Sequence, residues 1–119
     1  MSSALVYLGL KKRKEFLRVQ GGGERFRRRH FVMLVLANGS EDARVGFTVS
    51  RRVGNAVVRN RVRRRLREAL RHNSDYLCAG FDYVIIAFPR AAQMEFGVLC
   101  REVTSLLKET RGQASRSDS

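Results

Sequence analysis

Arginine is the residue type in this sequence whose number and spacing suggest a chemistry. Twenty of the 24 basic residues are Arg, and nine of these lie between Arg51 and Arg71, where the single acid is Glu68. A guanidinium carries a planar fork of N–H donors that matches phosphate oxygens and base edges, and it also stacks on rings. The spacing therefore predicts that this segment binds a polyanion.

The arginines lie on a segment with helical periodicity, residues 56–71, which follows Asn55 as a suitable N-cap. Its apolar residues Val58, Val62 and Leu66, continued by Ala69 and Leu70, recur at helical spacing and form one narrow stripe. The stripe is expected to face a core. The side of the helix away from this stripe carries Asn60, Arg63, Arg64 and Arg67.

A solvated helix face kept for solubility is the alternative interpretation. Such faces usually mix charges, because oppositely charged i,i+4 pairs stabilise a helix by about 0.2–0.5 kcal/mol. Here Arg59/Arg63 and Arg63/Arg67 are like-charged pairs, which an anionic partner would relieve. Helices that read DNA usually belong to helix-turn-helix units, zinc modules or dimers, and none is visible. The pattern favours RNA, and DNA is not expected as a partner.

The charge is also divided unevenly along the 119-residue chain, whose net charge is +13. Residues 1–71 carry 19 basic and five acidic residues, a net charge of +14, whereas residues 72–119 carry a net charge of −1. A near-neutral half that supports a basic half is typical of a protein that binds a polyanion.

Other chemistry is poorly represented. Cys78, Cys100, His30 and His72 have no zinc-like spacing, and no nucleophile or acid–base motif includes the histidines. The acids are scattered, so neither a catalytic site nor a metal site on the protein is predicted. No run approaches the ~18 apolar residues of a membrane span, and residues 5–10 are too short for a signal-peptide core. We expect a cytoplasmic protein with reduced cysteines and no membrane partner.

The elements that must position these arginines are predicted in the order helix, three strands, helix, strand, helix. Asn38–Asp42, with its Asn-Gly pair, is expected to be a hairpin loop, and residues 21–23 are expected to end the first helix. The pattern predicts an α+β fold. The predicted segments are a helix at 11–20, strands within 24–37 and at 43–50, a helix at 56–71, a strand at 82–88 and a helix at 95–110.

Residues 47–64, FTVSRRVGNAVVRNRVRR, resemble the signature of the protein subunit of bacterial ribonuclease P. Its core, Gly-Asn-Ala-Val-x-Arg-Asn-Arg, runs from Gly54 to Arg61. The resemblance extends over roughly residues 8–110 and includes Phe16 and the strand DYVII at 82–86. The chain shows no linker or repeat, which predicts one domain over residues 1–119, and its polar tail from 111 to 119 is expected to be disordered. The resemblance implies the same single domain. It also implies a two-layer sandwich of a four-stranded, mostly antiparallel sheet with three helices and a left-handed βαβ crossover, where handedness rules alone predict a right-handed one.

The resemblance implies a function in tRNA processing. Ribonuclease P (EC 3.1.26.5) is a ribonucleoprotein endonuclease that removes the 5′ leader of precursor tRNA, and its RNA subunit carries the catalysis with Mg²⁺. The small protein binds ribonuclease P RNA and the leader, and alone it is expected to be inactive. The basic helix would contact the RNA subunit, and the residues that the resemblance assigns to this contact are Arg59, Asn60, Arg61, Arg63, Arg64 and Arg67. The residues expected to bind the leader, in a cleft between the first helix and the sheet, are Phe16, Thr48, Ser50, Arg51 and Arg52.

Three positions depart from the family pattern. Gln20 and Leu34 replace aromatic residues, and Phe88 stands where a basic residue usually ends the last strand, with Arg90 displaced past Pro89. The alternatives to the implied function are a ribosomal or other structural RNA-binding protein, a protein-only nuclease and a DNA-binding regulator. A protein-only nuclease would need clustered carboxylates, which the sequence does not offer.

Overall fold

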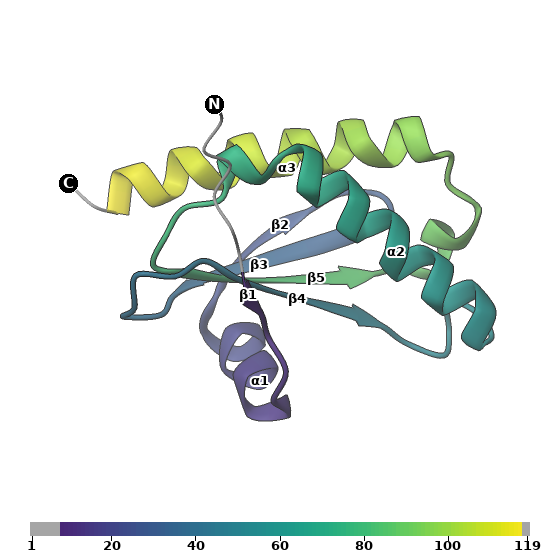
Figure 1. Ribbon diagram of the computed structural model, residues 1–119, viewed down its shortest axis with the longest axis horizontal. Coiled ribbons are helices and arrows are strands. Elements are labelled where there is room, and N and C mark those ends of the chain that lie inside the picture. Colours follow the sequence, from purple (N-terminus) through teal and green to yellow (C-terminus); the bar gives the residue numbers. More distant parts are fainter. Residues whose placement is uncertain (1–7, 118–119) are drawn as a thin grey trace.

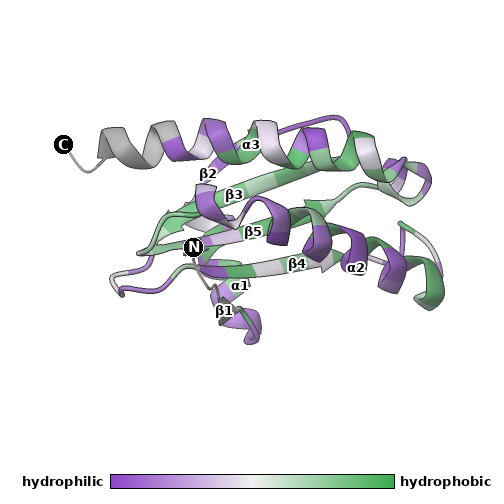
Figure 2. Ribbon diagram, turned by 45° about the horizontal axis from the view of Figure 1, so that its top comes forward, coloured by the Kyte–Doolittle hydropathy of each residue, from purple (hydrophilic) through white to green (hydrophobic). Residues whose placement is uncertain are grey.

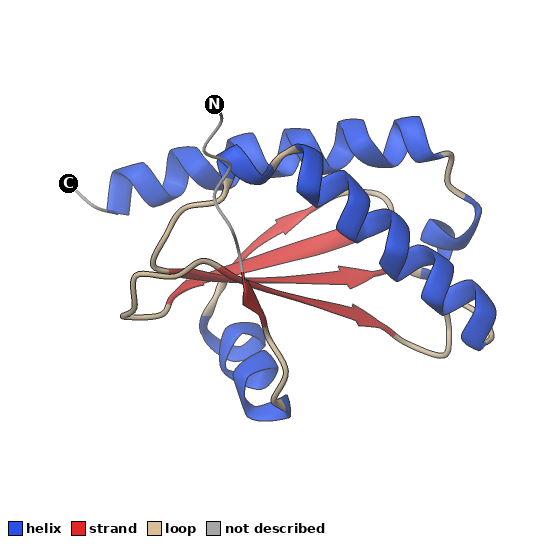
Figure 3. Ribbon diagram, in the orientation of Figure 1, coloured by secondary structure: helices blue, strands red, loops and turns tan. Residues whose placement is uncertain are grey.

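The computed structural model of the protein describes residues 8–117, with side chains over 9–111. Five strands form one sheet in the order β1-β4-β5-β3-β2 (Figures 1 and 3). The strands are β1 (Leu8–Gly9), β2 (Glu24–Arg27), β3 (Phe31–Ala37), β4 (Arg44–Val49) and β5 (Phe81–Ala87). The helices are α1 (Arg13–Gly22), α2 (Ala56–His72) and α3 (Phe96–Ser117), with 3₁₀ turns η1 (Ser74–Tyr76) and η2 (Pro89–Gln93).

The predicted fold class is confirmed: four main strands form a mixed, mostly antiparallel sheet, and three helices pack on it. Strand β3 pairs antiparallel with both β2 and β5, whereas β4 pairs parallel with β5. Helix α2 connects the parallel strands β4 and β5, and the crossover is left-handed (Figure 1). The short strand β1, which was not predicted, adds a parallel pairing to the first two residues of β4.

The two faces of the sheet carry separate cores. Helices α2 and α3 cover one face, where Phe31, Met33, Tyr83 and Ile85 are buried against residues such as Leu66. Helix α1 lies on the opposite face, and Val19 is buried there among Leu10, Val32, Leu34 and Val84. In Figure 2 the strands are largely hydrophobic, whereas much of α2 on the side turned away from the sheet is hydrophilic. The central strand β5 reads as a continuous apolar run because helices cover both of its faces.

The hairpin predicted at Asn38–Asp42 is wrong. Strands β3 and β4 do not pair, because β5 lies between them. The loop instead passes over the start of β5, where the Asn38 amide donates to the Gly80 carbonyl and the Gly80 amide donates to the Asp42 carbonyl. An Asn-Gly pair predicts a local turn but not which strands pair on either side of it. The apolar strand β5 lies at the centre of the sheet, where both of its faces are buried, and so it separates β3 from β4.

Two helix ends also differ from expectation. Helix α1 includes Gly21 and Gly22, and Gly23 is its C-cap, whose amide donates to the Val19 carbonyl at 2.8 Å. Helix α3 continues to Ser117, so the disordered tail predicted for 111–119 is wrong over 111–117, and residues 118–119 lie outside the described part. The segment 111–117 has no proline to stop the helix. No helix in the described range 8–117 is long and apolar enough to cross a membrane.

Candidate nucleic-acid interface

Helix α2 begins where its sequence predicts. The Asn55 side chain accepts a hydrogen bond from the Val58 amide at 3.0 Å, which satisfies one of the free donors of the first turn. Gly54 before it allows the turn to pack tightly, since a Cβ at this position would lie 2.8 Å from the Val58 Cβ. The apolar stripe is buried as predicted, with Val62, Leu66, Ala69 and Leu70 inside the core.

The basic face of α2, defined as the six residues predicted to bind RNA, remains on one helix but is not uniformly exposed. Asn60, Arg64 and Arg67 are exposed, whereas Arg59, Arg61 and Arg63 are half-buried. None of these arginines forms an ion pair with a described carboxylate. The single acid of α2, Glu68, is held by Arg71, which contributes to lowering the pKa of the Glu68 carboxyl. The basic face therefore keeps its positive charge.

Two of the predicted arginines donate to backbone carbonyls of the protein itself. Arg59 donates through its Nε to the Gly54 carbonyl at 3.2 Å, and the second is Arg61. Its Nη2 donates to the Ala92 carbonyl at 3.4 Å, and its Nε is buried without a hydrogen-bond partner. Arg65 similarly donates to the Met94 carbonyl at 3.1 Å. Arg61 and Arg65 hold η2 and the residue after it against α2. The sequence pattern could not separate these bracing arginines from the exposed ones.

A second surface lies where the outer edge of β4 is uncovered. Strand β1 pairs only with Arg44 and Val45, so the edge from Phe47 to Val49 carries no partner strand in the described part of the chain. A groove of about 480 Å³ follows this edge between α1 and α2. We call it the edge groove, and it is lined by Lys11, Arg13, Phe16, Leu17, Gln20, Phe47, Thr48, Val49 and Arg63.

Phe16 and Thr48, two of the residues predicted to bind the leader, lie together in this groove. Phe16 packs closely on β4, since a Cβ at Gly46 would lie 2.5 Å from its ring. The other predicted leader-binding residues, Ser50, Arg51 and Arg52, are exposed in the turn after β4 and do not line the groove. The Ser50 hydroxyl accepts a hydrogen bond from the Arg52 amide at 3.3 Å, which helps to fix that turn.

Sequence reasoning did not select Lys11, Arg13 or Leu17. Counted from Arg13, however, Phe16, Leu17 and Gln20 follow at spacings of three, four and seven, which places them on one side of α1. That periodicity was a usable signal. Gln20, noted as a departure, lines the groove as a polar residue. Leu34, the second departure, is fully buried beneath α1.

An ionic network fixes the position of α1 on the sheet. The fully buried carboxylate of Asp82 accepts hydrogen bonds from Arg18 on α1 at 2.8 Å, from Arg44 on β4 at 2.7 Å and from Asn38 at 2.8 Å. Arg44 also contacts Glu15 at 3.1 Å. Burial opposes ionisation of Asp82, but these hydrogen bonds outweigh it and hold its pKa below the ordinary value.

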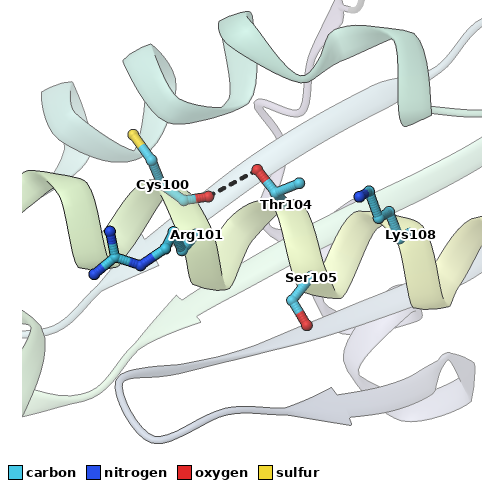
Figure 4. Close-up of a pocket in the computed structure, with 5 residues that line it drawn as sticks. All are labelled: Cys100, Arg101, Thr104, Ser105 and Lys108. Atoms are coloured by element: carbon cyan, nitrogen blue, oxygen red, sulfur yellow. Dashed lines mark hydrogen bonds between the residues drawn. The ribbon is translucent and has the colours of Figure 1, made fainter.

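The hollow on α3 shown in Figure 4 is not a comparable site. It is lined by Cys100, Arg101, Thr104, Ser105 and Lys108. The Thr104 hydroxyl donates to the Cys100 carbonyl of its own helix at 2.8 Å, and Ser105 accepts a hydrogen bond from Arg28. Burial, with a contribution from Glu68, raises the pKa of the Cys100 thiol, which favours the unreactive protonated form.

The donor set of the two surfaces does not suit a metal ion. Mg²⁺ prefers carboxylate and carbonyl oxygens, whereas the basic face and the edge groove present cations, aromatic rings and a hydroxyl. Over residues 8–117, no three His, Cys, Asp or Glu side chains gather into a possible metal site. The arrangement supplies cations and stacking surface for an extended anion rather than groups for bond cleavage.

Comparisons with known proteins agree on one family. The family model described as Ribonuclease P matches residues 7–111. The chain is 39% identical over 98 residues to the ribonuclease P protein component of Syntrophus aciditrophicus, with 82% of each chain covered. It is 40% identical over 101 residues to that of Caldanaerobacter subterraneus, covering 85% of this chain and 87% of the relative.

Solved structures give the same result. The RNase P protein of Staphylococcus aureus matches with a TM-score of 0.80 at 28% identity, covering 88% of this chain and 96% of that one. The RNase P protein of Thermotoga maritima matches with a TM-score of 0.77 at 31% identity, covering 84% and 94%.

Proposed function

The chain belongs to the family of ribonuclease P protein components, which act in tRNA processing, and on this premise we propose how its two surfaces divide the work. The basic face of α2 binds the catalytic RNA subunit. The edge groove binds the single-stranded 5′ leader of precursor tRNA. The proposed compartment is the cytoplasm.

The unpaired positive charge of α2 is the observation that supports binding of the RNA subunit by its basic face. Arg64 and Arg67 are exposed, and no described carboxylate neutralises them. When such cations bind phosphates, the counterions condensed on the RNA are released, and this release supplies sequence-independent affinity for structured RNA. Asn60 adds an amide that can donate to phosphate or accept from a base.

The second assignment is supported by the chemistry of the edge groove. Single-stranded RNA is bound by aromatic rings that stack on bases and by cations that follow the backbone. The groove offers Phe16 for stacking, Lys11, Arg13 and Arg63 for phosphates, and Thr48 as a hydroxyl. Because Arg63 also belongs to the basic face, the two surfaces meet at the edge of β4.

In the proposed mechanism, the protein orients RNA and leaves the chemistry to its partner. Ribonuclease P (EC 3.1.26.5) hydrolyses one phosphodiester bond at the 5′ junction, and Mg²⁺ on the RNA subunit supplies metal-ion catalysis there. The protein's cations reduce repulsion between the two RNAs, so that the leader and the cleavage site are held in place. The protein alone is expected to be inactive.

A cleavage assay at low Mg²⁺ tests this proposal. Precursor tRNA is incubated with the protein alone, with a bacterial ribonuclease P RNA alone, and with both. We expect efficient cleavage at the 5′ junction only in the mixture. Cleavage by the protein alone would reveal a missed active site. A mixture no faster than the RNA alone would favour a structural RNA-binding protein instead.

A further inference from the structure

The described cations of helix α3 lie on one side of the helix, and its acids lie on another. Arg101, Lys108 and Arg111 recur at helical spacing, with Thr104 between the first two, so they share one side within about 80° of arc. At about 1.5 Å per residue, the row extends about 15 Å along the helix. We call it the α3 stripe, and it consists of Arg101, Thr104, Lys108 and Arg111.

The acids of the same helix are occupied on its other side. Glu102 lies 3.2 Å from the His30 Nδ1 atom, and Glu109 accepts a hydrogen bond from Arg28 at 2.8 Å, so both acids face the β2–β3 turn. No cation of the α3 stripe forms an ion pair with a described carboxylate. Charges kept for solubility are usually mixed in sign, because i,i+4 pairs of opposite charge stabilise a helix. The separation of charge on α3 therefore favours an anionic partner.

An aromatic ring holds two cations of the α3 stripe in place. The Lys108 ammonium lies 5.8 Å and the Arg111 guanidinium 5.9 Å from the centroid of the half-buried Tyr76 ring in η1. Arg111 also donates to the Asp75 carbonyl at 3.3 Å. A cation that lies over a ring is restrained but keeps N–H donors for a phosphate. The stripe is therefore partly ordered before a partner binds, which lowers the entropic cost of binding.

The hollow shown in Figure 4, of about 490 Å³, lies along the α3 stripe. Arg101 and Lys108 line it, and both side chains are exposed. The hollow has no reactive group, so it is not suited to bond cleavage. A concave surface bordered by charges of one sign does, however, concentrate the electrostatic potential that attracts a polyanion.

The α3 stripe lies beside the basic face of α2. Helices α2 and α3 pack side by side over the same face of the sheet (Figure 1), and the Thr104 hydroxyl lies 2.9 Å from the Asn73 side-chain oxygen at the end of α2. Glu68 is the acid of α2, and Arg71 and His72 contact its carboxylate at 2.7 and 3.2 Å. The negative charge next to the two surfaces is thus compensated within α2. A long polyanion that lies on the basic face can continue onto the stripe.

We propose that the α3 stripe is a second contact with the catalytic RNA subunit, in which Arg101, Lys108 and Arg111 bind phosphates beyond those reached from the basic face of α2. This inference rests on the proposed function, because the RNA must first bind α2. An acidic protein segment is the other class of partner that suits the charge. Continuity with the basic face favours the RNA.

The test measures the affinity of the full chain for a bacterial ribonuclease P RNA at several salt concentrations, without precursor tRNA. Arg101→Ala/Lys108→Ala removes two exposed charges and spares Arg111, which also bonds to the protein itself. Arg101→Lys/Lys108→Arg keeps both charges. The matched control Lys14→Ala/Arg25→Ala removes two exposed charges on the α1 side of the molecule. Urea unfolding checks that each variant is folded.

We expect Arg101→Ala/Lys108→Ala to bind the RNA about fivefold to twentyfold more weakly at about 0.1 M salt, with a salt slope smaller by about 1.8, because each phosphate contact contributes about 0.9. The charge-conserving variant and the α1-side control should bind within about twofold of wild type. In a hydroxyl-radical footprint at saturating protein, Arg101→Ala/Lys108→Ala should lose protection of one RNA region. That region should differ from the one that Arg64→Ala exposes.

Four results would overturn the inference. The first is unchanged affinity in Arg101→Ala/Lys108→Ala while Arg64→Ala still weakens binding, which would leave the proposed function of α2 intact and the stripe free for an acidic protein. The second is an equal loss in the α1-side control, which would be an effect of net charge. The third is an equal loss in the charge-conserving variant, which would be structural. The fourth is a loss seen only with precursor tRNA. If Arg64→Ala has no effect either, the proposed function of the basic face fails as well.

Discussion

At the scale of single residues, the basic face of α2 contains two kinds of arginine. Arg64 is exposed and available to a partner, whereas Arg61 is half-buried and bonded to the Ala92 carbonyl. An arginine that braces its own protein affects binding through structure, and an exposed one affects it through charge. The same residue type thus serves two purposes one helical turn apart.

This difference predicts separable effects of substitution. Arg64→Ala should lower affinity for the RNA subunit and reduce its salt slope by about 0.9, while the free energy of unfolding stays within about 0.5 kcal/mol of wild type. Arg61→Ala should also lower the free energy of unfolding by about 1 kcal/mol, because the Ala92 carbonyl loses its donor. Urea unfolding and filter binding at several salt concentrations measure the two quantities. Equal stability of the two variants would contradict the bracing role.

At the scale of elements, the contact between α1 and β4 sets the width of the edge groove. Gly46 leaves room for the Phe16 ring, which occupies the space that a side chain at this position would need. Asp82 then joins α1 to the start of β4 and β5 through Arg18 and Arg44. Helix α1 is therefore positioned by one close approach and one ionic network.

Gly46→Ala should displace Phe16, since the added Cβ would lie 2.5 Å from its ring. Overpacking of this kind costs about 1–3 kcal/mol. We expect weaker binding of leader-bearing precursor tRNA and nearly unchanged binding of the RNA subunit, measured by fluorescence anisotropy. The control Gly97→Ala lies in α3, where the nearest atom to a new Cβ is the far end of Arg101 at 3.8 Å. A loss that is equal for both RNAs would show that Gly46 supports the fold only.

The sequence predicted the elements better than their pairing. The helical periodicity of the apolar residues and the N-cap Asn55 predicted α2 correctly as far as the buried Leu70, because these signals are local in the sequence. The hairpin failed because pairing depends on which strand takes the centre of the sheet, and Asn38 and Gly39 report only a turn. Within the site, Phe16 and Thr48 were found through a family signature. The bracing of Arg61 was not, since it depends on Ala92, 31 positions away.

At the scale of the whole molecule, the buried charge of Asp82 connects stability to pH. Its folded-state pKa lies below the ordinary value of 3.8, so the ionised form stabilises the fold above that pH. This stabilisation is lost as the pH falls through the folded pKa, when the carboxylate is protonated and its contacts with Arg18 and Arg44 weaken.

Asp82→Asn should lower the free energy of unfolding at neutral pH by about 3 kcal/mol, because it weakens the charged hydrogen bonds that the buried carboxylate accepts from Arg18 and Arg44. Arg44 then keeps only Glu15 as a carboxylate partner among the described residues. The difference between the variant and wild type should shrink below about pH 4 as wild type loses the same charge. Denaturant unfolding from pH 7 to pH 3 measures both curves. Asn38→Ala serves as a control that removes a donor but keeps the carboxylate. A difference that stays constant across this range would exclude the ionised carboxylate as its cause.

The central position of β5 has a consequence for how the chain folds as the ribosome makes it. Strands β3 and β4 emerge early but have no pairing with each other, and both wait for residues 81–87. The nascent chain therefore exposes its arginine-rich helix before the sheet beneath that helix exists. Long-range pairing of this kind slows folding and lengthens the exposure of apolar surface. The sheet is complete only after residue 87 of the 119 has been made, and the core only after α3 adds Leu99, Val103 and Leu106.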